Sequence, residues 1–476
     1  MPFSRSTAVS LIVACALFME QLDGSIIATA LPVIAKSLDT SPLHLNLAIT
    51  SYMFSLAVFI PLSGWVADRF GARTVFRSAI VVFTLGSVLC GISQNLGELV
   101  AARILQGAGG AMMVPVGRLV MLRTVPRVEL VNAMAWLTAP ALIGPILGPP
   151  VGGLIVTYAS WRWIFFVNLP IGILGLVLAT MLIENVREQG REPLDLRGFI
   201  LMALALSGLV FSFETAGRHL LPVGVVIGLA LVGVVCLALY FKHVRTIAHP
   251  IIDLGLMKFA TYRASVTGGS LFRIGVGALP FLLPLMLQVG FGVSPATSGL
   301  LTFAGAAGAI VMKATAAPLI RIFGFRPILI ANAIVNAVFL MGCALFGPKT
   351  GHAAIFVFLL VGGFFRSLQF TALNTVAYAE VPAALISRAN TLYSMLQQLS
   401  LSMGVAVGAL LLNLTLYWKG DVHLGPWDFW PSYIAIGALS LISMSSFMAL
   451  PKNAGDEMSG HAPSAATEAA KHEDPA

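Results

Sequence analysis

Long apolar runs alternate with short polar segments along the chain. Fourteen of these runs have about 20 residues, the length that a helix needs to cross the hydrocarbon core of a bilayer. They occupy residues 8–31, 47–67, 76–94, 97–119, 133–158, 163–183, 197–214, 221–241, 264–289, 298–319, 327–346, 353–377, 391–414 and 430–450. The pattern predicts an all-α integral membrane protein with fourteen transmembrane helices, and an even number places both termini on one side of the membrane.

Composition agrees with this pattern. Hydrophobic residues make up 58% of the 476 residues and charged residues 10%, whereas soluble globular domains carry about 25% charged residues. The mean hydropathy is +0.91. These values exclude a soluble globular protein.

Basic residues are distributed unevenly between the two sides of the predicted membrane protein. The net charge is +8, and 19 of the 28 Lys and Arg residues fall in loops on the side of the N-terminus, against 5 on the opposite side. Cytoplasmic loops carry such an excess, so we expect both termini in the cytoplasm. Because no soluble domain is predicted, the basic excess does not indicate a nucleic-acid partner.

Polar segments divide the chain into four parts. We expect a six-helix N-terminal half at 1–183, a linker with two extra transmembrane helices at 184–263, a six-helix C-terminal half at 264–450 and a disordered cytoplasmic tail at 451–476. The sequence FGAR at 70–73, after the second helix, is echoed by FGFR at 323–326, after the tenth. Such an echo indicates that the two halves are related as an internal repeat.

The predicted fifth helix carries the sequence GPILGPPVGG at 144–153. Its glycines at 144, 148 and 152 form a stripe without side chains down one helix face. Such a stripe lets a neighbouring helix approach closely, and the prolines at 145 and 149 bend the helix. Taken alone, the segment is equally consistent with a kinked packing helix of no further function.

The first predicted helix contains two carboxylates well inside its apolar run, Glu20 and Asp23. They are three residues apart and share one helix face. An ionisable group at membrane depth costs about 2.5–3.5 kcal/mol to insert, so it marks a functional site by default. Because burial favours the neutral form, a carboxyl group that alternates between wet and dry surroundings can bind and release a proton. A structural carboxylate paired with a basic residue is the alternative for both.

The loop between the second and third helices has the sequence GWVADRFGAR at 64–73. Gly71 permits a tight turn, and Asp68 at a helix end can pair with a basic residue of a neighbouring helix. Such a pair would hold the cytoplasmic face closed in one conformation. A charged loop that only sets the topology is the alternative.

The fourth helix contains RILQGAGGA at 103–111. Its glycines are better explained by helix packing than by nucleotide binding, since no strand precedes them and no acidic partner follows. The sequence has no HExxH, GxSxG or Walker-type signature, and its four cysteines lack the spacing of a metal site. We therefore expect no enzymatic activity, no metal and no cofactor.

These segments resemble motifs of the major facilitator superfamily, and WRWIFFVNLPIG at 161–172 is similar to the signature of its fourteen-helix drug:proton antiporter branch. The resemblance covers roughly residues 8–450, and FLLPLMLQVGFG at 281–292 is similar to one multidrug-transporter type of that branch. It implies two six-helix halves plus two inserted helices. It further implies a monomeric exporter of small amphipathic compounds in the bacterial inner membrane, working by alternating access and driven by the proton gradient.

The resemblance also implies roles for individual residues. The segment around Asp23 resembles the LDxTIVNxALP pattern, in which the acid is tied to proton coupling. Arg103 and Gln106 match RxxQGxGxA, in which the arginine supports that coupling. Glu20 has no such support and remains a candidate on burial alone. The implied antiporter motif comprises Gly144, Pro145, Gly148, Pro149, Gly152 and Gly153, and the implied gating loop comprises Gly64, Asp68, Arg69, Gly71 and Arg73.

Basic residues inside the apolar runs of the second half are not explained by the resemblance. With two deep carboxylates against four deep bases, the central region can be net positive, which would favour an organic anion or a metal chelate as substrate. Local pairing of these bases, or extension to the membrane interface, is the alternative. A membrane sensor that kept the fold without transport is a third hypothesis. The substrate-cavity candidates are Gln106, Arg273, Lys313, Arg366, Gln369 and Asn374.

Overall fold

The computed structural model describes residues 5–124, 143–144, 147–183, 194–215, 222–247, 250–382, 385–420 and 423–455. Every regular element in these ranges is helical, as predicted. Thirteen helical segments within them are long and apolar enough to cross a membrane. The predicted helix at 133–158 falls partly outside the described residues, and its portion at 147–158 is helical. The predicted tail at 451–476 lies outside them beyond residue 455.

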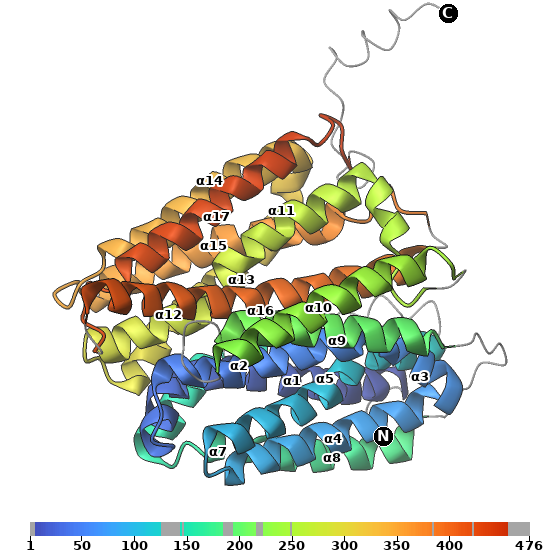
Figure 1. The fold of residues 1–476 in the computed structure, drawn as a ribbon, viewed down its shortest axis with the longest axis horizontal. Coiled ribbons are helices and arrows are strands. Elements are labelled where there is room, and N and C mark those ends of the chain that lie inside the picture. Colours follow the sequence, from blue (N-terminus) through green and yellow to red (C-terminus); the bar gives the residue numbers. More distant parts are fainter. Residues whose placement is uncertain are drawn as a thin grey trace, which may run out of the picture.

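The first part of the chain forms a group of helices that lies at the bottom of Figure 1. We call α1 to α8, together with the helical segment at 147–158, the N-terminal group. Its elements are α1 (Arg5–Ser37), α2 (Pro42–Phe59), η1 (Ile60–Leu62), α3 (Ser63–Phe70), α4 (Ala72–Ile92), α5 (Leu96–Thr124), α7 (Trp163–Phe166) and α8 (Asn168–Leu182).

The last part of the chain forms a second group, most of which lies at the top of Figure 1. This C-terminal group comprises α11 (Ala260–Gly277), α12 (Leu279–Leu285), the π-helix η3 (Met286–Gly290), α13 (Pro295–Phe323), α14 (Phe325–Gly342), η4 (Cys343–Leu345), α15 (His352–Val376), α16 (Ile386–Lys419) and α17 (Trp430–Met448). The predicted boundaries of the two halves stay a prediction, but the grouping of helices follows the order of the chain.

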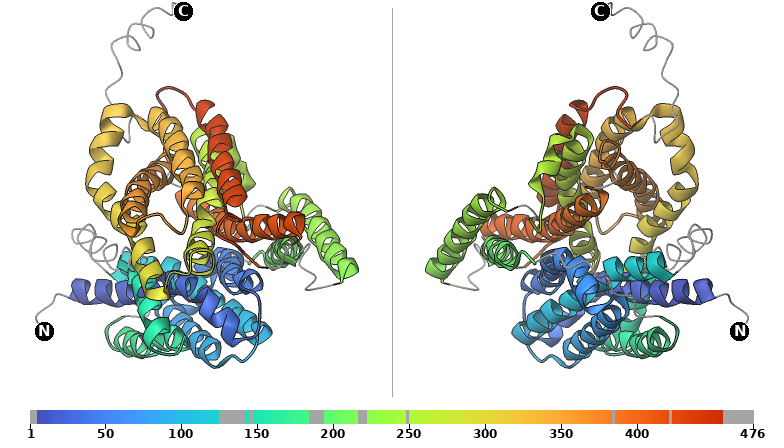
Figure 2. Two further views of the ribbon diagram at one scale, coloured as in Figure 1. Left: turned by 90° about the vertical axis from the view of Figure 1, so that its left-hand side faces the viewer. Right: turned by 90° about the vertical axis from the view of Figure 1, so that its right-hand side faces the viewer.

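Two helices between these groups pack on each other. They are α9 (Leu196–Thr215) and α10 (Val223–Val244), followed by the short helix η2 (Leu254–Lys258). The pair packs against the rest of the molecule through contacts of α9 with α2 and α16. The end-on views in Figure 2 show the pair at the side of the molecule. Most of α10 is exposed in the protein, as expected for an apolar helix that faces lipid.

Local sequence explains where several helices end. Gly71 (φ 89°) separates α3 from α4, and Gly324 (φ 74°) separates α13 from α14. Only glycine adopts such a backbone conformation without strain. The two glycines belong to the repeated FGxR sequences, so the predicted echo corresponds to the same sharp turn in both groups.

Contacts between the two groups involve α1, α2 and the segment at 147–158 on one side and α12, η3, α13 and α16 on the other. Gln288 in η3 donates a hydrogen bond to the Thr29 carbonyl in α1, 2.9 Å long. At Gly153 and at Gly299 the two backbones come so close that a Cβ atom would overlap the carbonyl oxygen of Pro295 or of Pro149, respectively. These contacts seal the groups together at the end away from α3, the end that carries α7 in Figure 1.

Candidate functional site

Asp23 in α1 and Arg103 in α5 form an ion pair in the interior of the N-terminal group. Arg103 Nη1 lies 2.5 Å from Asp23 Oδ2, and both side chains are 0% exposed. The arginine is held in place because its Nε donates to the Ala48 carbonyl of α2 at 3.0 Å and its guanidinium lies over the Tyr52 ring, 4.1 Å from the centroid. The two residues expected to serve proton coupling are therefore direct partners.

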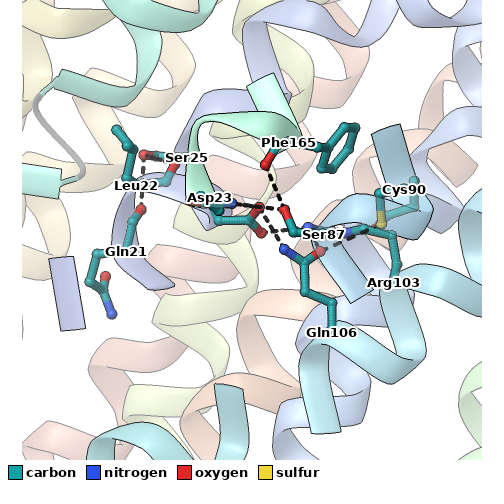
Figure 3. A network of polar contacts seen from close by, with 11 residues as sticks. Gln21, Leu22, Asp23, Ser25, Ser87, Cys90, Arg103, Gln106 and Phe165 are labelled. Carbon is teal, nitrogen blue, oxygen red and sulfur yellow. Dashed lines mark hydrogen bonds and ion pairs between the residues drawn. The ribbon is translucent and has the colours of Figure 1, made fainter. Parts of the chain in front are cut away.

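Two amide side chains complete the surroundings of Asp23, and Figure 3 labels one of them, Gln106. Gln106 Nε2 and Asn168 Nδ2 both donate to Asp23 Oδ1, at 2.8 and 2.9 Å. Gln106 also accepts a 2.7 Å hydrogen bond from Arg103 Nη1 through its Oε1. Asp23 thus accepts hydrogen bonds from three donors on two helices, an arrangement that stabilises the ionised carboxylate without access to solvent.

Gln106 therefore belongs to the surroundings of Asp23, although we expected it in a substrate cavity. It lies one turn after Arg103 on α5, and the two side chains bond to each other and to the same carboxylate. Its side chain is fully buried. Direct contact of Gln106 with a substrate stays a prediction.

Asn168 and Ser87 are functional candidates that sequence reasoning missed. Asn168 at the start of α8 also donates to Ser87 Oγ at 3.0 Å, and Ser87 Oγ donates to the Phe165 carbonyl of α7 at 2.9 Å. Asn168 is the asparagine of the WRWIFFVNLPIG segment. A signal was thus present in the motif, but the partner of the asparagine depends on how α8 packs against α1.

Glu20 is buried one turn before Asp23 on α1. The expectation that the two carboxylates share one helix face rests on their three-residue spacing. The role of Glu20 in proton coupling stays a prediction.

The glycine stripe packs against α1 directly beside Asp23. Added Cβ atoms at Gly144 and Gly148 would meet Gln21 and Ser25, respectively, and one at Gly152 would overlap Ile26 and Thr29. Ser25 Oγ donates to the Gly144 carbonyl at 3.3 Å. The close approach expected of this stripe is present, whereas Pro145 lies outside the described residues.

The expected gating loop lies at the opposite end of the molecule from α7 (Figure 1). Gly64, Asp68 and Arg69 lie in α3, Gly71 forms the turn, and Arg73 is in the first turn of α4. Arg69 is exposed and its guanidinium lies 5.5 Å from the Trp65 ring centroid. The pairing of Asp68 with a neighbouring helix stays a prediction.

Arg273 in α11 is the most deeply buried basic residue of the C-terminal group, at 1% exposed. Its Nη2 donates to Asn374 Oδ1 at 3.1 Å and to Tyr393 Oη at 2.5 Å. Its Nε has no hydrogen-bond partner among the described residues. No carboxylate of the described residues forms an ion pair with Arg273. Arg273 is therefore a buried cation with only neutral partners.

The remaining cavity candidates of the second half do not gather around Arg273. Lys313 is exposed on α13 and its Nζ lies 3.4 Å from Thr371 Oγ1. Arg366 lines a small pocket between α14 and α15 together with Asn336 and aromatic side chains. Gln369 is buried and donates to the Leu329 carbonyl at 3.2 Å. Of the expected set, only Asn374 contacts Arg273.

Comparisons with known proteins agree with the fold and the motifs. The family model of the Major Facilitator Superfamily matches residues 13–405 and 265–459. Two relatives described as "Putative multidrug resistance protein MdtD" are similar to this chain. The protein from Escherichia fergusonii is 43% identical over 408 residues, 85% of each chain, and that from Escherichia coli O6:H1 is 41% identical over 442 residues, 92% of this chain and 93% of the relative. The multidrug-transporter type indicated by the segment at 281–292 is this one.

Solved structures of low sequence identity share the fold. The crystal structure of a D-xylose-proton symporter has a TM-score of 0.67 at 15% identity and covers 95% of this chain and 99% of that chain. The crystal structure of a bacterial homologue of the human lysosomal transporter Spinster has a TM-score of 0.64 at 14% identity. It covers 98% of this chain and 100% of that chain. The chain therefore belongs to the Major Facilitator Superfamily and is a multi-pass membrane transporter, not an enzyme.

Proposed function

We propose that the chain is a proton-coupled efflux transporter that exports small amphipathic compounds across the bacterial inner membrane by alternating access. The observation that carries the proposal is Asp23, a carboxylate without solvent access that is held by Arg103, Gln106 and Asn168. The proton gradient would drive the cycle with no cofactor, and the protein would act as a monomer with both termini in the cytoplasm. The inserted helices α9 and α10 would link two six-helix halves.

The contacts between the two groups of helices support alternating access. With cytoplasmic termini, the end that carries Gly153, Gln288 and Pro295 faces the periplasm. The close backbone contacts and the hydrogen bond to Thr29 hold this end shut. Protonation of Asp23 would remove its charge and weaken its bonds to Arg103, so the free energies of the two conformations would change relative to each other.

A transport assay in liposomes tests the proposal. The purified protein is reconstituted with a pH-sensitive dye inside, a proton gradient is imposed, and lipophilic drug cations are added. We expect proton movement with the wild type and none with Asp23→Asn, because the amide cannot carry a proton. Glu98→Gln, which alters an exposed carboxylate at the start of α5, should behave as the wild type. Equal proton movement with Asp23→Asn would contradict the role of Asp23.

A second candidate function is export of an organic anion or a metal chelate by the same proton antiport. The buried guanidinium of Arg273 favours it, because a buried cation with neutral partners can pair with an anionic substrate at little further desolvation cost. Organic anions, alone and as metal complexes, are the probes in the same assay.

Neutralising Arg273 is expected to slow anion transport strongly. Arg273→Leu should lose at least about tenfold in rate, which corresponds to one charge-assisted hydrogen bond, while Arg273→Lys should retain part of it. Arg263→Leu, on an exposed position of the same helix, is the matched control. Transport of lipophilic cations that is unaffected by Arg273→Leu, with no anion transport in the wild type, would leave Arg273 as a structural residue. An absence of proton movement with both lipophilic cations and organic anions would favour the hypothesis of a non-transporting sensor.

A further inference from the structure

Asn168 connects Asp23 to two other elements of the N-terminal group. Its Nδ2 donates both hydrogens, one to Asp23 Oδ1 of α1 at 2.9 Å and one to Ser87 Oγ of α4 at 3.0 Å. Ser87 Oγ in turn donates a hydrogen bond to the Phe165 carbonyl of α7 at 2.9 Å. The series of bonds runs from a buried carboxylate to the junction of α7 and α8, and Figure 3 labels Asp23, Ser87 and Phe165 along it.

The present arrangement suits an ionised Asp23. A carboxylate only accepts hydrogen bonds, and Arg103, Gln106 and Asn168 all donate to it. A protonated carboxyl group carries one O–H donor, which needs an acceptor, because a buried polar hydrogen without a partner is costly. Arg103 has no acceptor atom, and Gln106 Oε1 already accepts from Arg103.

Asn168 carries the acceptor that a protonated Asp23 needs. Its Oδ1 is buried and has no hydrogen-bond partner among the described residues. The two ends of a side-chain amide have nearly the same shape, so rotation by about 180° exchanges donor and acceptor within the same volume. After rotation, Oδ1 faces Asp23 and the hydrogen bond from Nδ2 to Ser87 is broken.

We propose that Asn168 is a positioning residue for proton coupling: its amide donates to the ionised Asp23 and rotates to accept from the protonated Asp23. This inference rests on the proposed function. Rotation releases Ser87, whose hydroxyl anchors the Phe165 carbonyl, and so transmits protonation from α1 to α4 and α7. The residue is the first of α8, two positions after the end of α7, where a change in its bonds alters how α7 and α8 pack.

Other titratable or charged groups act on the same region and must be separated from Asp23. They are Glu20 of α1, Tyr52 of α2, Cys90 of α4 and Arg103 of α5. Of these, Glu20 is the second carboxyl group, so an infrared signal of a carboxyl group needs assignment. The difference between the wild type and Asp23→Asn provides it.

Infrared difference spectroscopy of the full-length protein in lipid, with pH as the variable, tests the inference without a substrate. The carbonyl stretching band of a protonated carboxyl group that is present in the wild type and absent in Asp23→Asn reports Asp23. In Asn168→Leu we expect the band to persist to a pH about one unit higher, because the lost bond to the charged form is stronger than the lost bond to the neutral form. Its frequency should rise, since the O–H group no longer donates to Asn168.

Matched variants decide between the outcomes. Asn332→Leu removes a buried amide of the C-terminal group that also has an Oδ1 without a partner among the described residues, and it should leave both midpoint and frequency unchanged. Asn168→Ala replaces the leucine variant if the latter does not fold. Two results would overturn this inference but not the proposed function. One is a change in the Asp23 band frequency in Gln106→Leu with none in Asn168→Leu. The other is an unchanged midpoint pH of the Asp23 band in Asn168→Leu. Absence of an Asp23 band in the wild type at every pH would overturn the proton-carrying role of Asp23 itself.

Discussion

Arg103→Leu is expected to destabilise the protein by about 3–5 kcal/mol, the cost of leaving one member of a buried ion pair without its partner. Asp23 and Arg103 are both fully buried, so water cannot replace the lost guanidinium. The variant also loses the bond to the Ala48 carbonyl and the contact with the Tyr52 ring. Because a lone buried charge is unfavourable, Asp23 should remain neutral throughout the cycle, and proton-driven transport should be lost.

Two further variants separate charge from geometry at Arg103. Arg103→Lys keeps the charge but has neither the Nε donor nor the planar group over Tyr52, so we expect intermediate stability. The double variant Asp23→Leu/Arg103→Leu removes both charges and should recover much of the stability without recovering transport. Thermal unfolding in detergent and the liposome assay measure the two quantities, with Arg263→Leu as the exposed control. A wild-type melting temperature for Arg103→Leu would contradict the structural importance of the pair.

Thirteen of the fourteen predicted runs correspond to helices of spanning length in the described residues, but hydropathy marked only the apolar sections of these helices. The run at 298–319 corresponds to α13, which extends from Pro295 to Phe323. The extra turns follow from local chemistry. The Ser294 side chain accepts a hydrogen bond from the Thr297 amide at the start, Pro295 occupies the first turn, and Gly324 ends the helix. Polar ends of a membrane helix are set by capping, which a hydropathy window does not detect.

The candidate site could be predicted in part because its charged members stand out in an apolar sequence. Asp23 and Arg103 were found on two helices, and the structure pairs them. Asn168 was not found, because its motif marks the residue but does not show that its partner is Asp23, which depends on how α8 packs against α1. The basic residues of the second half also stand out in the sequence, but their surroundings could not be predicted from it. Arg273, Lys313 and Arg366 look alike in sequence, yet one is buried, one is exposed and one lines a pocket.

Gly153→Ala is expected to open the contact between the two groups of helices at the end that carries α7. An added Cβ would lie 3.0 Å from the Pro295 carbonyl carbon and would overlap its oxygen, and backbone atoms cannot move aside without shifting α13. Overpacking of this kind costs about 1–3 kcal/mol, which would lower the population of the closed conformation by about 5- to 150-fold. Gly299→Ala should act in the same way, since its Cβ would overlap the Pro149 carbonyl oxygen.

Proton leak into liposomes without any substrate measures the effect, because a conformation that no longer closes at this end uncouples proton movement from export. Gly228→Ala on α10 is the matched control. That glycine is also helical, but a Cβ there meets nothing within 4 Å, and alanine should be tolerated or slightly stabilising. If Gly153→Ala and Gly228→Ala leak equally, the glycine contact only packs the helices. If Gly153→Ala and Gly299→Ala both leak while each folds, close backbone contact across the two groups is what holds this end of the protein shut.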